Sequence, residues 1–269
     1  MYKLIRRAYA VFKAYFLSDI VRSKGFIYGL ISLSLWLMIF LMPMSLFIGE
    51  EQDPDVVANY GFTAILIFML YSIATWDFAA ELRFLINQGI LEYYLSTNSG
   101  IIPHYTGLIP VSLMWLLLAL SINYVVLSIV FNPPLLVIHN SLCLVLGLTM
   151  LFIVLISYAL ILGGSLISSG SSGFILEILG FILPIATGGL TPLSRLPELF
   201  RIFALYTPFS YPAEVIRYSI LGFEPVMSIE KMLLIGYVYS IIFLIVSILY
   251  FKYQLKKILK EGVRVTTLW

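Results

Sequence analysis

The sequence has few charged residues and almost none of the side chains from which disulfides or metal sites are built. Only 11% of its 269 residues are charged, against about a quarter in soluble domains, whereas 61% are hydrophobic. Cys143 is the only cysteine, so the chain has no disulfide framework and no thiolate metal cluster. His104 and His139, the only histidines, are far apart in the sequence. We therefore expect them to be interfacial residues and expect no metal site.

The sequence also lacks a nucleotide-binding motif. There is no Gly-x-x-x-x-Gly-Lys-[Ser/Thr] loop, so the chain cannot bind ATP phosphates by the usual route. The Gly- and Ser-rich run at residues 163–173 has no lysine, and we interpret it as a short flexible cytoplasmic turn. We therefore expect no enzymatic activity on this chain.

Long apolar runs recur along the chain, and each has the roughly 20 residues that a helix needs to cross the hydrocarbon core. Six runs predict transmembrane helices, at about residues 25–48, 56–75, 105–130, 135–162, 174–190 and 229–251. Pro43 and Pro184 are expected to kink the first and the fifth. The first run is too long for the apolar part of a signal peptide, so we expect it to be retained. The sequence thus predicts an all-α integral membrane protein with a single transmembrane domain over residues 1–269.

Basic residues gather at the two ends of the chain and predict its orientation. They precede the first run at Lys3, Arg6, Arg7, Lys13, Arg22 and Lys24, and they follow the last run, within residues 252–269, at Lys252, Lys256, Lys257, Lys260 and Arg264. The loop between the first two runs is acidic and holds Glu50, Glu51, Asp53 and Asp55. Because cytoplasmic loops carry an excess of Lys and Arg, we expect a multi-pass protein of the plasma membrane with both termini in the cytoplasm.

The N-terminal region, residues 1–24, is amphipathic at helical period. Between residues 2 and 20, one face carries Lys3, Arg6, Arg7 and Lys13, and the opposite face carries Ile5, Ala8, Tyr9, Phe12 and Phe16. This pattern is typical of a helix that lies in the plane of the lipid headgroups. We interpret it as a membrane-surface anchor, with lipids as its partner.

The predicted cytoplasmic loop at residues 76–104 contains a cluster that does not suit a solvated loop. Gly89 is expected to end one helix and to start another. The short piece that follows is apolar and aromatic, and its members are Ile90, Leu91, Tyr93, Tyr94 and Leu95, with Glu92 as the only charge. Such a cluster either packs on the membrane or docks on another protein.

The predicted outer segment at residues 191–228 is rich in proline, glycine and aromatics. Pro197 suits the first turn of a helix, Pro208 is expected to end that helix, and Gly222 is a natural stop for a second helix that starts near Pro212. Irregular backbone cannot face lipid without partners for its N–H and C=O groups. We therefore predict a re-entrant helical hairpin, with two short helices joined at residues 206–211, that dips partway into the outer leaflet before the last span.

Two segments resemble the membrane subunits of type-2 ATP-binding cassette (ABC) transporters. Gly-Ile-Leu-Glu-Tyr-Tyr-Leu-Ser-Thr at residues 89–97 is similar to the family's Gly-Thr-Leu-Glu-x-Leu-Leu-x-x-Pro, with Ile90 in place of Thr and Asn98 near the expected Pro. Residues 188–222 resemble its C-terminal signature, in which a Pro-Leu-Ser…Leu-Pro run leads into an Asn-Pro-aromatic turn and then a Glu-x-x-Arg helix that ends in Gly. The order of these segments and the predicted spans extend the resemblance over the whole chain.

This resemblance implies a transmembrane permease subunit of an ABC exporter. Two such subunits, identical or related, would form the substrate pathway as a dimer. Separate ABC ATPase subunits on the cytoplasmic side would hold ATP and Mg, with no cofactor on this chain and no nucleic acid partner. The loop after Gly89 would be the coupling helix that sits in a cleft of the ATPase.

The resemblance also assigns residues to roles. The residues expected to receive the ATPase motion are Glu81, Arg83, Gly89, Leu91, Glu92 and Tyr94. The second and fifth spans would line the pathway, with the polar candidates Thr63, Tyr71, Ser72, Glu177 and Thr187. The outer gate would be formed by Pro197, Pro208, Phe209, Glu214, Arg217 and Gly222. Two alternatives stay open: Glu177 either lines the pathway or lies at the inner interface, and Arg217 pairs either with a carboxylate such as Glu214 or with the partner subunit.

Two other functional classes compete with this interpretation. A secondary, ion-coupled transporter needs charges within the membrane to bind its coupling ion, and only Glu177 qualifies. A non-transporting membrane assembly factor would not need the docking loop. An adjacent ATPase gene would favour the ABC interpretation over the secondary transporter, and affinity capture on the loop would separate it from the assembly factor.

The predicted orientation can be tested with single cysteines in a chain without Cys143. We expect Asp53→Cys to react with a membrane-impermeant maleimide added to intact cells, because the acidic loop lies outside, and Lys260→Cys to react only after the membrane is opened. Labelling of position 260 but not of position 53 in intact cells would contradict the assignment.

Overall fold

The structure is a computed structural model that describes residues 2–32, 34–35, 54–96, 101–135, 137–169, 179–180, 182–183, 187–188 and 192–261. These residues form helices and the connections between them, and no strand occurs among them. The helices within them that are long and apolar enough to cross a membrane are Pro54–Asn87, Ile102–Val130, Ser141–Leu166 and Ile229–Ile258. The prediction of an all-α membrane protein is confirmed at this level.

These four helices correspond to the second, third, fourth and sixth predicted spans. The start of the fourth was predicted wrongly at residue 135, because α7 (Ser141–Ser169) begins six residues later. Asn140 sets this start, since its side-chain oxygen accepts a hydrogen bond from the Cys143 N–H at 3.0 Å and caps the helix. Most of the first and fifth predicted spans lies outside the described residues, and so do Pro43, Pro184 and Glu177.

The second predicted span is part of a longer continuous helix. It consists of α3 (Pro54–Ile73), a π-helical stretch η2 (Ala74–Ala80) and α4 (Glu81–Asn87). Gly89 follows with φ of 68°, a left-handed conformation that glycine adopts at little cost. The predicted break at Gly89 is confirmed, and the short helix α5 (Ile90–Ser96) starts at the next residue.

The chain divides into two compact units, and the division falls within the long helix. The N-terminal unit comprises Met1–Met69 and Gly89–Leu135, and the C-terminal unit comprises Leu70–Gln88 and Leu136–Trp269. The N-terminal unit thus contains most of α3 together with α5, whereas the end of α3, η2 and α4 belong to the C-terminal unit.

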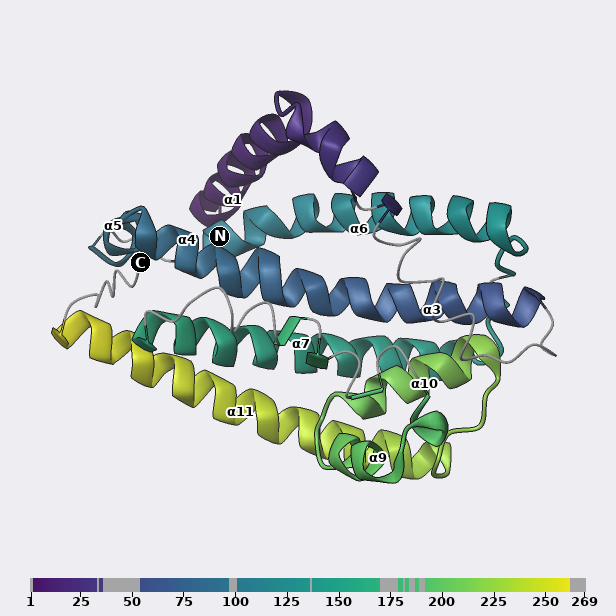
Figure 1. Ribbon diagram of the computed structural model, residues 1–269. Coiled ribbons are helices and arrows are strands. Elements are labelled where there is room, and N and C mark those ends of the chain that lie inside the picture. Colours follow the sequence, from purple (N-terminus) through teal and green to yellow (C-terminus); the bar gives the residue numbers. More distant parts are fainter. Residues whose placement is uncertain are drawn as a thin grey trace. The chain divides into compact units, whose positions relative to one another are not determined.

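In the N-terminal unit, α1 (Tyr2–Tyr15) packs on the first part of α6 (Ile102–Val130) (Figure 1). The two backbones approach closely at Gly107, where a Cβ atom would overlap with the carbonyl oxygen of Ala8. Further along, α6 packs against α3 through a core of Phe62, Ile65, Val126 and Leu127. These contacts hold α1, α3 and α6 together as one packed group.

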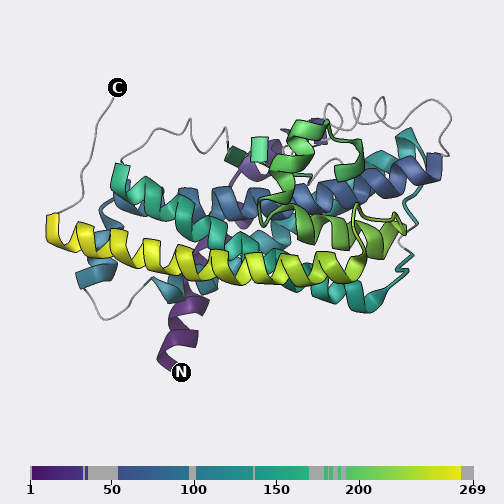
Figure 2. The same ribbon diagram turned by 90° about the horizontal axis from the view of Figure 1, so that it is seen from below.

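In the C-terminal unit, α7 and α11 (Ile229–Glu261) run side by side (Figures 1 and 2). Tyrosine hydroxyls of α11 bridge the pair at two levels, because Tyr237 bonds to Thr149 at 2.7 Å and Tyr250 bonds to Ser165 at 3.1 Å. The helices α9 (Glu198–Leu205) and α10 (Ser210–Leu221) lie near the beginning of α11 (Figure 1).

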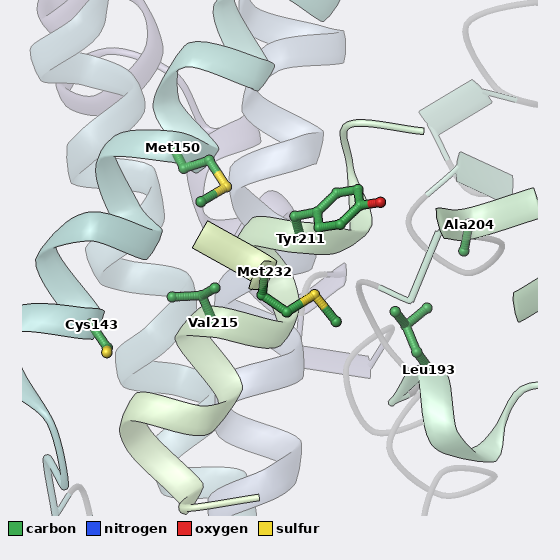
Figure 3. Packing of buried hydrophobic residues seen from close by; sticks show 7 residues of the cluster. All are labelled: Cys143, Met150, Leu193, Ala204, Tyr211, Val215 and Met232. Atoms are coloured by element: carbon green, nitrogen blue, oxygen red, sulfur yellow. The ribbon is translucent and has the colours of Figure 1, made fainter. Parts of the chain in front are cut away.

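An apolar core joins α10 to α7 and α11 (Figure 3). Its buried members are Cys143, Met150, Leu193, Ala204, Tyr211, Val215 and Met232. Glycines allow this close packing: a Cβ at Gly147 of α7 would lie only 2.9 Å from an Ile216 side-chain carbon, and one at Gly236 of α11 would lie 2.7 Å from the Tyr211 Cβ. The core therefore fixes the position of α10 against both long helices.

Candidate functional site

The two-helix segment, residues 192–222, has the local structure that its prolines and glycine predict. Pro197 directly precedes α9 as its N-cap, one position earlier than predicted. Tyr206 follows the helix, and α10 begins at Ser210, shortly after Pro208. Gly222 ends α10 with φ of 69°, and its N–H donates to the Tyr218 carbonyl at 3.0 Å. The two short helices are confirmed.

A buried ion pair ties α10 to the chain that precedes α9. The Arg217 guanidinium donates to the Glu214 carboxylate, and the two side chains are only 2% and 5% exposed. Arg217 also donates to the Gly188 carbonyl at 2.7 Å, and Glu214 accepts a hydrogen bond from the Leu193 N–H at 3.2 Å. Of the two partners considered for Arg217, the structure shows Glu214. Buried charge is tolerated only when it is paired and hydrogen-bonded. We call this set of bonds the lock, because it holds α10 to the residues that precede α9.

Phe209, which joins the two helices, points into the C-terminal unit. It is 7% exposed, and its ring lies 5.9 Å from that of Tyr71, 5.8 Å from Tyr158 and 5.5 Å from Phe243, measured between centroids. These three aromatics come from α3, α7 and α11. The Tyr71 hydroxyl donates to the Phe209 carbonyl at 3.1 Å. These contacts hold the Phe209 ring among residues of its own chain.

The pathway candidates lie in different parts of the structure. Tyr71 and Thr187 are both fully buried, and the Thr187 hydroxyl donates to the Leu183 carbonyl at 2.6 Å. Ser72 is half-buried on the next position of α3. Thr63 belongs to the N-terminal unit, where its hydroxyl donates to the Asn59 carbonyl of its own helix at 2.9 Å. Glu177 lies outside the described residues.

Two hydroxyl residues beside Tyr71 were not predicted. Thr75 donates to the Tyr71 carbonyl at 3.0 Å and lies 3.2 Å from the Tyr158 hydroxyl. The spacing of four residues between Tyr71 and Thr75, which places both on one helix face, was the only available signal for Thr75. Together, these groups connect the long helix to α7 and to the residue that joins α9 and α10.

The predicted coupling residues lie on two separate helices. Glu81 and Arg83 are half-buried on α4 in the C-terminal unit, whereas the residues after Gly89 belong to α5 in the N-terminal unit.

Within α5, Leu91 is fully buried, so its side chain packs inside the chain. Its role in coupling stays a prediction. The exposed face of α5 carries Glu92 and Tyr93, the latter 65% exposed. Tyr94 is half-buried and faces His104.

The sequence matches no known protein family, and no curated protein matches it significantly. Across the part of the chain that the structure describes, no group of three or more His, Cys, Asp or Glu side chains could hold a metal ion. The candidate sites are therefore defined by packing, hydrogen bonds and exposure alone. They are the lock and aromatic contacts of the two-helix segment, and the exposed face of α5.

The lock can be tested by removing one charge. We expect Glu214→Gln to lower the free energy of unfolding by about 3–5 kcal/mol, because it leaves the Arg217 charge buried without its counter-charge. Thermal unfolding of the purified protein in detergent measures the change. Glu198→Gln, at an exposed position of α9, is the matched control and should change stability by less than about 0.5 kcal/mol. Equal unfolding temperatures for the two variants would show that the pair does not hold the segment.

Proposed function

We propose that this chain is the membrane subunit of an ABC transporter that works as an exporter. In this proposal, two such subunits form the substrate pathway between them, and separate ATPase subunits on the cytoplasmic side bind ATP and Mg. The observation that supports it most directly is α5, a short helix between two spanning helices that is anchored on one side and exposed on the other.

The geometry of α5 suits a docking helix. A helix of seven residues is too short to be stable by itself in water, so packing must hold it in place. Leu91 supplies that packing, and Tyr94 adds a second attachment. The opposite side presents the exposed ring of Tyr93 beside the carboxylate of Glu92. Tyrosine is enriched at protein interfaces, where its ring gives contact area and its hydroxyl a hydrogen bond.

The C-terminal unit supplies a mechanical connection for such a subunit. The helix that contains α4 is continuous through η2 to Tyr71, and Tyr71 holds Phe209. A displacement of α4 would therefore act on the two-helix segment through this one helix. The π-helical stretch lies between these points, and such stretches are frequent at functional sites. The permease would have two states, and ATPases that have closed on ATP would contact one of these states more favourably than the other. ATP binding would therefore favour that state.

The two-helix segment would form the outer gate of the pathway and dip into the outer leaflet. Helix α9 exposes the large apolar side chains of Leu199, Phe200, Ile202 and Phe203, and the exposed ring of Tyr206 follows the helix. Aromatic and aliphatic side chains of this kind are typical of helices at a membrane interface. In the proposed orientation, both termini lie in the cytoplasm and the protein is located in the plasma membrane.

The exposed face of α5 provides the test of this function. We expect Tyr93→Ala to weaken binding of the ATPase subunit at least tenfold, because a buried interface tyrosine typically contributes more than about 1.4 kcal/mol. ATP hydrolysis that depends on the permease should fall with it. Both are measured on complexes reconstituted from purified subunits.

Tyr206→Ala is the matched control for this substitution. Tyr206 is 77% exposed but lies at the end of α9, so its loss should leave ATPase affinity unchanged. Wild-type affinity and wild-type coupled hydrolysis in Tyr93→Ala would remove the support that α5 gives to the proposed function.

A further inference from the structure

A single buried histidine connects three helices of the N-terminal unit. His104 lies at the start of α6 and is only 3% exposed. The Tyr15 ring at the end of α1 meets it edge-on at 5.6 Å between centroids, and the Tyr94 ring of α5 lies at the same centroid distance. Tyr105, the next residue of α6, meets it edge-on at 5.7 Å.

Two of these helices are fixed to each other without the histidine. One turn further along α6, Gly107 brings the backbone of α1 so close that a Cβ atom would overlap with the Ala8 oxygen. The positions of α1 and α6 relative to each other are thus fixed by their own close packing.

Helix α5 contacts the packed pair of α1 and α6 through Tyr94, which meets His104 of α6. The Tyr94 hydroxyl lies 3.3 Å from the His104 Nδ1 atom, a long hydrogen bond in which the tautomer of the ring decides which group donates. The buried Leu91 side chain adds apolar packing, which is not directional. The Tyr94–His104 contact therefore restrains the angle of α5, because a hydrogen bond and a ring contact both depend on direction.

We propose that His104 is the positioning residue that sets the orientation of α5 relative to α1. This inference rests on the proposed function for its biological use, but the orientation itself is a property of the isolated chain. A docking helix held at one angle presents Glu92 and Tyr93 in a single arrangement. It then avoids the entropy cost of ordering a loose helix when the partner binds.

The orientation can be measured without any partner. Spin labels are placed at Ile5→Cys on α1 and Glu92→Cys on α5, both exposed positions of the N-terminal unit, in a chain that carries Cys143→Ala. Pulsed electron–electron double resonance on the purified protein should give one narrow distribution of the distance between the two labels. His104→Ala should broaden it or split it. Ile102→Ala is the matched control, since Ile102 is 69% exposed on the same helix turn, and it should leave the distribution unchanged.

Conservative variants separate positioning from folding. His104→Phe retains the ring contacts but loses the hydrogen bond, and Tyr94→Phe loses the same bond from the other side. Each should broaden the distribution less than His104→Ala does, and the double variant should be no broader than either single one. If His104→Ala does not fold, these variants still decide the matter. Narrow, unchanged distributions in all of them would overturn the proposal.

A second measurement, on unlabelled protein, distinguishes this proposal from the function on which it rests. If α5 is a docking helix, His104→Ala should weaken ATPase binding about tenfold, and His104→Phe should restore part of the loss. A broadened distance distribution together with a wild-type chain that binds no ATPase would support the role of His104 and overturn the proposed function.

Discussion

The structure depends on one constraint: backbone N–H and C=O groups that are buried away from water must find partners inside the protein. Long helices meet it automatically, but the turn between α9 and α10 does not. There, side chains of α10 replace the missing helical bonds. Ser210 donates to the Ala204 carbonyl at 2.8 Å, and Tyr211 donates to the Leu205 carbonyl at 2.6 Å. The Glu214 carboxylate of the lock accepts a hydrogen bond from the Leu193 N–H in the same way.

Because α10 supplies all of these partners, the two-helix segment is organised around it. The apolar core seats α10 on α7 and α11, and Phe209 joins it to the aromatic side chains of the long helix and its neighbours. A displacement of α10 would disturb the hydrogen bonds that it makes to Leu193, Ala204 and Leu205, which all precede it in the chain. These bonds link α10 to the residues before it, and the outer gate that we propose would need such a link for the segment to move as one body.

Local signals in the sequence predicted the element boundaries well, because glycine and proline act on their immediate neighbours. Gly89 and Gly222 adopt the left-handed backbone that ends their helices. The prediction that Arg217 could pair with Glu214 succeeded for the same reason, since residues three apart share a helix face. The start of α7 was missed because apolar residues precede Asn140, and apolar content alone does not distinguish a helix from an extended connection.

Contacts between distant segments were beyond local reasoning. Leu91 lies in a seven-residue helix with apolar side chains on several faces, so the pattern did not show which face is buried. His104 was expected at an interface, yet residues 15 and 94 surround it only after three helices have packed. Tyr158 joins Thr75 across 83 positions of sequence and had no local signal at all.

The most direct test is mass measurement of the complex that this chain forms when it is purified gently from native membranes. The account predicts two permease-type chains and two ATPase chains, with a mass that falls by the ATPase contribution when the exposed face of α5 is altered. Recovery of the chain alone, or only with proteins that hydrolyse no ATP, would contradict it.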